Sequence, residues 1–183
     1  MTTVQSARPW GDELPEALMH VTSAAALPSI SRFGLVAGAQ WANTDVAAYH
    51  ARLMEDAGHA PVVLSMPREV LMRLRAGPDW DALETPPLEV IMRDTAALNL
   101  IWTKGDPTPE NCLALIGTMR TGQAIPASIL HQYMPHLREQ ASRARNLQRN
   151  TSRSARKVKM MKKKRKEAKS EDQIFFKPLA EGP

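Results

Sequence analysis

The chain has 183 residues, of which 43% are hydrophobic and 5% aromatic, and this is enough for one compact domain with a core. The single cysteine, Cys112, excludes an internal disulfide, and the five histidines show no spacing typical of a zinc site. No apolar run approaches the roughly 20 residues of a membrane-spanning helix, and no N-terminal signal pattern is present. We therefore expect a cytoplasmic protein without a metal centre.

The net charge of +5 is unevenly distributed along the chain. Residues 1–137 carry 9 Lys and Arg against 14 Asp and Glu, a net charge of −5, whereas residues 138–183 carry 15 against 5, a net charge of +10. The sequence thus predicts a folded domain over residues 1–136 and a basic extension over residues 137–183. Like charges at this density repel, so the extension is either helical or disordered when no polyanion is bound.

A strand and a short helix are predicted near the N-terminal end. Residues 18–23 are typical of a strand that ends on polar residues. These polar residues are His20, Thr22 and Ser23. A helix follows over residues 27–33, because Pro28 suits its first turn and apolar residues recur there at helical spacing. Gly34 suits the left-handed residue that ends a helix.

The rest of the first 136 residues alternates between strands, helices and turns, which predicts an α+β domain. Strands are predicted over residues 36–42, 61–66, 88–92, 98–103, 112–119 and 123–125. Helices are predicted from residue 44 to the stop at Gly58, over residues 67–75 and over residues 126–133, with a loop over residues 80–87.

Several pieces of the chain share a pattern with one known group of proteins. They are the strand ending near His20 with the helix after it, the aromatic stretch 41–49, the strand at 62–65 and the Ile-Pro segment 123–129. Together they resemble the ADP-ribosyltransferase superfamily, which includes RNA 2′-phosphotransferases and DNA-targeting toxins. The resemblance covers about residues 17–132. It implies an ADP-ribosyltransferase-like fold of two small packed sheets with peripheral helices.

The resemblance also implies NAD as cofactor and a set of residues that bind it. His20 would bind the NAD ribose, with Thr22 or Ser23 assisting nearby. Trp41 and Tyr49 would enclose the nicotinamide, a flat ring that favours aromatic stacking.

A catalytic carboxylate is harder to place. Many members of the superfamily carry a glutamate on a late strand, shortly before the Ile-Pro segment, where it stabilises the positive charge that develops on the ribose. Residues 117–120 contain no acid here. Glu110 is the candidate that would join His20 in catalysis, and Glu89 lies on another predicted strand. Either one of these glutamates supplies the carboxylate from an unusual position, or the domain has lost catalysis.

The basic extension predicts contact with nucleic acid or a ribonucleoprotein, because Lys and Arg neutralise phosphates and release counterions. The residues that carry this prediction are Arg153, Arg156, Lys157, Lys159, Lys162, Lys163, Lys164, Arg165 and Lys166. The alternative is a tail that only solubilises the protein. The apolar group that follows either folds back onto the domain or anchors a partner protein: Ile174, Phe175 and Phe176.

Three functions follow from these patterns. The first is NAD-dependent transfer of ADP-ribose to nucleic acid or to a nucleic-acid-associated protein. The second is an inactive scaffold of the same fold that binds nucleic acid or a nucleoprotein assembly through the extension, since fold alone does not establish activity. The third is a structural component of a larger nucleoprotein assembly.

Overall fold

The computed structural model describes residues 14–84 and 107–174, with side chains described up to residue 163. In these ranges five strands form one antiparallel sheet in the order β3-β1-β2-β5-β4. Their bounds are Ala17–Ser23 (β1), Gln40–Ala42 (β2), Pro61–Pro67 (β3), Ala76–Gly77 (β4) and Thr118–Thr121 (β5). The α+β class is confirmed, but the described strands form a single sheet rather than the expected two.

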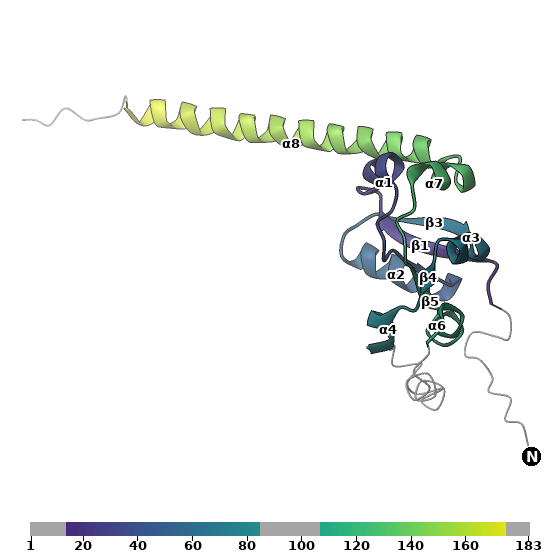
Figure 1. Cartoon of the computed structure of the whole chain (residues 1–183). Coiled ribbons are helices and arrows are strands. Elements are labelled where there is room, and N and C mark those ends of the chain that lie inside the picture. Colours follow the sequence, from purple (N-terminus) through teal and green to yellow (C-terminus); the bar gives the residue numbers. More distant parts are fainter. Residues whose placement is uncertain (1–13, 85–106, 175–183) are drawn as a thin grey trace, which may run out of the picture. The chain divides into compact units, whose positions relative to one another are not determined.

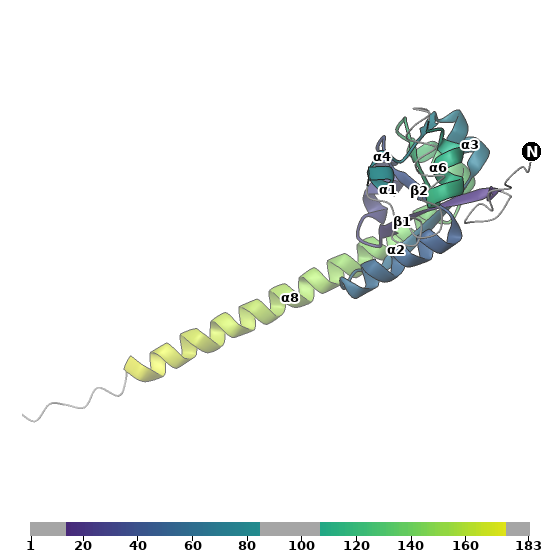
Figure 2. The same ribbon diagram turned by 90° about the horizontal axis from the view of Figure 1, so that it is seen from below.

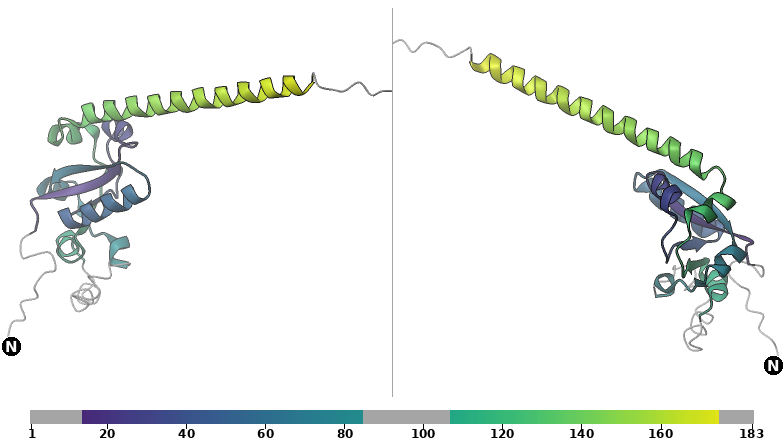
Figure 3. Two further views of the ribbon diagram at one scale, coloured as in Figure 1. Left: turned by 180° about the vertical axis from the view of Figure 1, so that it is seen from behind. Right: turned by 45° about the horizontal axis from the view of Figure 1, so that its top comes forward.

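Helices lie on both faces of this sheet. Their bounds are Leu27–Phe33 (α1), Thr44–Asp56 (α2), Arg68–Arg73 (α3), Trp80–Glu84 (α4), Pro109–Ile116 (α6), Ala127–Tyr133 (α7) and Leu137–Ile174 (α8). Helix α2 lies on one face of the sheet, and α1 and α7 lie on the other (Figure 1, Figure 3). The core contains the fully buried side chains of Leu18, Trp41, Met66, Ile125 and Leu130. Apolar burial on both faces of the sheet therefore holds the helices to it.

Strand β1 pairs along its full length with one neighbour, β3, and at a single position with the other, β2. Strand β1 pairs with β3 along all seven of its residues. With β2 it shares a single residue pair, Met19 and Ala42, while β2 makes three pairs with β5. The backbone ladder between β1 and β2 therefore ends next to His20, the residue that follows Met19.

Capping residues determine where two helices begin. Asn43 Oδ1 accepts from the Val46 N–H at 2.9 Å, and Thr108 Oγ1 accepts from the Asn111 N–H at 3.1 Å. The second cap starts α6, so the strand predicted over residues 112–119 is wrong for most of its length. The apolar run there belongs to a buried helix, because a short continuous apolar run fits a buried helix as well as a buried strand.

Two smaller predictions also differ from the structure. The loop predicted over residues 80–87 begins as helix α4, because Leu83 is buried against α6 and this packing outweighs the turn-rich sequence. The strand predicted over residues 123–125 is reduced to one isolated bridge at Ile125. The predicted strands at 88–92 and 98–103 lie outside the described residues.

The basic extension is helical where it is described. Helix α8 runs for 38 residues without a break, and Figure 2 shows it as a nearly straight rod. Leu137 and Ala141, in its first turns, are buried, and the chain divides into two compact units between Ser142 and Arg143. Among the described helices, none combines the length and the apolar character needed to cross a membrane.

Gly34 ends α1 in a conformation that other residues adopt only with strain, with φ at +88° and ψ at −164°. A Cβ at this position would lie 2.0 Å from the Ile125 carbonyl oxygen, which accepts from the Leu35 N–H at 2.9 Å. We expect Gly34→Ala to lower the free energy of unfolding by about 3 kcal/mol, from backbone strain and from overlap with Ile125. Urea denaturation measures this loss.

Gly38→Ala is the matched control. Gly38 also has a positive φ, +82°, but a Cβ there would meet nothing within 4 Å. The free energy of unfolding of this variant should fall only by the cost of the backbone strain, about 1–2 kcal/mol. Equal losses in the two variants would show that the close approach of Gly34 to Ile125 does not matter.

Candidate functional site

His20 lies on β1, where the pairing between β1 and β2 ends. Its ring Nδ1 is 2.8 Å from the backbone carbonyl oxygen of Gln40, on β2. A carbonyl oxygen only accepts hydrogen bonds, so Nδ1 carries the proton and donates it. In the neutral ring Nε2 is then an acceptor. The side chain thus links the two strands where their backbone ladder stops.

The surroundings of His20 favour its neutral form. Burial lowers the pKa of His20 below its ordinary value, and the hydrogen bond to the Gln40 carbonyl opposes part of this change. The residue is nevertheless partly exposed. A neutral imidazole with its proton on Nδ1 can accept a hydrogen bond at Nε2 from a hydroxyl or amide group of a ligand.

Thr22 and Ser23 follow His20 on β1, and both are partly exposed. Side chains alternate along a strand, so Thr22 lies on the same face as His20 and Ser23 on the opposite face. The Ser23 carbonyl accepts from the Ala26 N–H at 2.9 Å, in the turn that leads into α1. Of these two predicted residues, Thr22 is therefore the one that shares the face of His20.

The structure places the two predicted aromatic residues in different environments. Trp41 is fully buried, and its ring centroid lies 5.6 Å from that of His20. Its indole Nε1 is buried without a hydrogen-bond partner. Tyr49 is 60% exposed on α2, with its ring 6.0 Å from that of His50. Trp41 is thus brought together with His20, and no ring contact in the described part of the chain joins Tyr49 to His20.

Glu110 lies in the first turn of α6, on a helix rather than on a strand. An acid is favourable there because its charge complements the positive end of the helix dipole. Strand β5 carries Arg120 and no acid. Within residues 14–84 and 107–163, no hydrogen bond or ion pair connects Glu110 with His20.

Asp79 is a residue of this region that the sequence did not single out. It is fully buried, and its carboxylate accepts from Arg120 Nε at 2.7 Å and from Gln40 Nε2 at 2.5 Å. Arg120 also donates to Asp81 at 2.6 Å. The hydrogen bond to Asp79 is the main reason why the pKa of Arg120 is raised. The one feature of the sequence that could have drawn attention to Asp79 is its position just before α4, which is typical of a residue that caps a helix.

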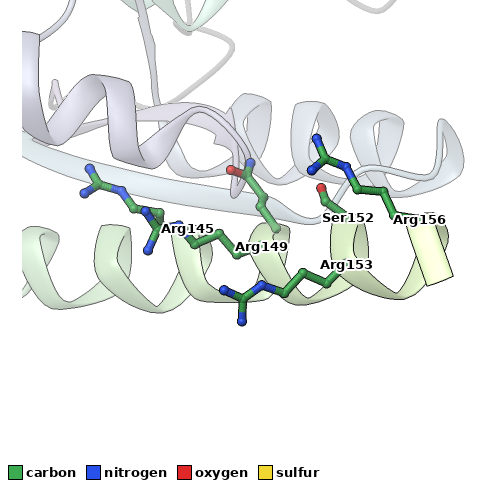
Figure 4. Close-up of a pocket in the computed structure, with 6 residues that line it drawn as sticks. Arg145, Arg149, Ser152, Arg153 and Arg156 are labelled. Carbon is green, nitrogen blue, oxygen red and sulfur yellow. The ribbon is translucent and has the colours of Figure 1, made fainter.

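Four arginines follow one face of α8, and we call them the arginine face (Figure 4). They are Arg145, Arg149, Arg153 and Arg156, and all four are exposed. Their spacing of four, four and three residues returns to the same side of a helix at each turn. The sequence prediction began at Arg153 and missed the first two, although this spacing is visible in the sequence.

The other predicted cationic residues continue along the same helix. Those described as exposed are Lys157, Lys159, Lys162 and Lys163. Lys164, Arg165 and Lys166 belong to the helix, but their side chains lie outside the described part. Ile174 is the last residue of α8, and Phe175 and Phe176 lie outside the described residues.

The other titratable groups of the described residues are the candidates for a metal site or a nucleophilic site. In the described ranges no three His, Cys, Asp or Glu side chains gather in a way that could hold a metal ion. Burial raises the pKa of the Cys112 thiol to about 11, so this side chain is a poor nucleophile at neutral pH. No family model matches the chain, and no curated protein or solved structure is significantly similar to it.

Proposed function

We propose that the protein binds nucleic acid through the arginine face and the lysines that follow it on α8. The observation that carries this proposal is the charge of the helix. Residues 143–163 contain nine Lys and Arg and no Asp or Glu, and the structure holds all of them on one continuous helix. A long cationic surface of this kind is typical of proteins that contact phosphate backbones.

The geometry of the arginine face suits a row of phosphates. Four residues of helix rise about 6 Å and three rise about 4.5 Å, so successive arginines start about 4.5–6 Å apart along the axis. Each planar guanidinium can bind a phosphate through two hydrogen bonds, which an ammonium group cannot do. In the free helix, neighbouring arginines at this spacing repel each other by about 0.2–0.5 kcal/mol per pair. Phosphates would remove this repulsion, so binding also stabilises the helix.

A salt titration tests this proposal. We expect the logarithm of the association constant to fall linearly with the logarithm of salt concentration, with a slope of about −0.9 per neutralised phosphate on duplex and about −0.7 on single strands. Little preference for base sequence is expected, because phosphate contacts carry no sequence information. Fluorescence anisotropy with labelled oligonucleotides of several sequences measures both properties. A flat salt response would contradict the proposal.

The His20 region favours a second candidate function, NAD-dependent transfer of ADP-ribose on an ADP-ribosyltransferase-like fold. The supporting observation is that His20 is partly exposed and that its Nδ1 donates to the Gln40 carbonyl, which leaves Nε2 of the neutral ring to accept from a ribose hydroxyl. Helix α8 would then hold the nucleic-acid target and raise its local concentration. The same geometry fits an inactive scaffold, because no described carboxylate contacts His20.

NAD binding separates these two possibilities. If the domain is an active transferase, NAD should raise the melting temperature of the wild-type protein and release nicotinamide, detected by mass spectrometry, when a nucleic-acid target is present. His20→Ala should remove the shift, because the acceptor nitrogen is lost. His59→Ala is the matched control, since His59 is exposed beyond the end of α2 and should leave the shift unchanged. No shift and no nicotinamide release with the wild type would favour the scaffold.

A further inference from the structure

Asp79 collects hydrogen bonds from three separate parts of the chain. Gln40 donates to it from β2, Arg120 from β5, and the Ala82 N–H from the first turn of α4 at 3.4 Å. Its side chain has no exposed surface. A buried carboxylate is costly unless its oxygens are hydrogen-bonded and its charge is paired, and here both conditions are met.

Gln40 connects this buried carboxylate to His20. Its side-chain amide donates to Asp79, and its backbone carbonyl accepts from the His20 ring. Gln40 and Arg120 are directly opposite each other in the pairing of β2 with β5, so their side chains share one face and converge on Asp79. On the β1 side, β2 has one residue pair only, at Ala42. The backbone of Gln40 is thus held by its pairing with β5 and by its own side chain, and not by a residue pair with β1.

From this chain of contacts we infer that Asp79 is a positioning residue for His20. By anchoring the Gln40 side chain, Asp79 holds the Gln40 carbonyl where it accepts the Nδ1 proton of His20. The carbonyl in turn keeps the ring in the tautomer whose Nε2 is an acceptor, and it fixes the orientation of the ring. This role does not depend on which ligand His20 binds, so it goes beyond both functions proposed above.

The alternative is that Asp79 only stabilises the fold by pairing with Arg120. The two roles differ in what they predict for the imidazole of His20. A purely structural Asp79 can be replaced without changing the tautomer in molecules that remain folded. If Asp79 positions His20, its replacement changes the tautomer even in folded molecules, because the carbonyl that selects the tautomer is no longer held in place.

The experiment is an NMR measurement of the imidazole nitrogens in the full chain labelled with ¹⁵N-histidine. Long-range ¹H–¹⁵N correlations distinguish the Nδ1-protonated from the Nε2-protonated ring. We expect His20 to be Nδ1-protonated in the wild type and to lose this preference in Asp79→Leu, whose side chain has no polar atom that could hold the Gln40 amide. Asp81→Leu is the matched control: it removes the exposed partner of Arg120 and leaves the hydrogen bond between Gln40 and Asp79 in place. It should keep the wild-type tautomer.

Gln40→Leu keeps the inference testable if Asp79→Leu does not fold. This variant retains the backbone carbonyl and the pair between Asp79 and Arg120, and it removes only the link between Asp79 and Gln40. We expect the same loss of tautomer preference as in Asp79→Leu. A wild-type His20 spectrum in folded Gln40→Leu, or in folded Asp79→Leu, would overturn the inference. A wild type that is not Nδ1-protonated would overturn it as well.

Discussion

Replacing all four residues of the arginine face by glutamine is expected to abolish most of the nucleic-acid affinity of the protein. The variant changes Arg145, Arg149, Arg153 and Arg156, which are exposed on α8. Four neutralised phosphates contribute about 0.9 each to the salt slope on duplex DNA, so the slope should become shallower by about 3.6. The affinity near 0.1 M salt should fall by about a thousandfold. Anisotropy titrations at several salt concentrations measure both quantities.

The matched control replaces the same four arginines by lysine. Lysine keeps the charge and the helix propensity but binds phosphate as a point charge rather than through a planar pair of donors. The salt slope of this variant should therefore stay close to that of the wild type, with a smaller loss of affinity. A glutamine variant with the wild-type slope would show that the lysines farther along α8, or another part of the chain, make the phosphate contacts.

Arg120→Met is expected to destabilise the folded domain about as strongly as Gly34→Ala. Arg120 pairs with Asp79, whose side chain is fully buried, at 2.7 Å. Removing the cation leaves a buried carboxylate without its charge partner, which typically costs about 3–5 kcal/mol. We expect about 3 kcal/mol, the lower end of this range, because 34% of the Arg120 side chain is exposed. Urea denaturation followed by circular dichroism measures the loss.

Arg73→Met provides the comparison for this prediction. Arg73 pairs with Glu69 at 3.7 Å, and both side chains are more than 70% exposed. Solvent-exposed pairs of this kind contribute about 0.3–0.5 kcal/mol, so this variant should be close to the wild type. A similar small loss in Arg120→Met would mean that solvent reaches Asp79, and the account of a buried, paired carboxylate would be wrong.

The elements near the N-terminal end could be predicted from the sequence because their signals are local. The predicted strand over residues 18–23 and helix over residues 27–33 correspond to β1 and α1 within one residue. The start of α2 at Asn43 was visible as well, because a capping side chain acts within one turn of its own backbone. The arginine spacing on α8 is local in the same sense, and it identifies one face of a helix wherever that helix forms.

Helix α6 and the single sheet could not be read in the same way. The apolar run at residues 112–119 fits either a strand or a helix. Most of it forms a helix because Thr108 caps the first turn and because Leu113 and Ile116 are buried. The sheet order depends on pairings between strands that are far apart in sequence, such as β2 with β5. Such pairings depend on how whole elements pack, and a pattern within one segment does not contain them.

The sequence by itself determined the charge division, the polar end of β1 and the cationic repeat of α8, because each depends on residue types within a few positions of one another. Only the tertiary structure decided that Asp79, Gln40 and Arg120 meet and that Trp41 is buried beside His20. A buried carboxylate needs donors from several directions, and a chain can supply them only by bringing distant segments together.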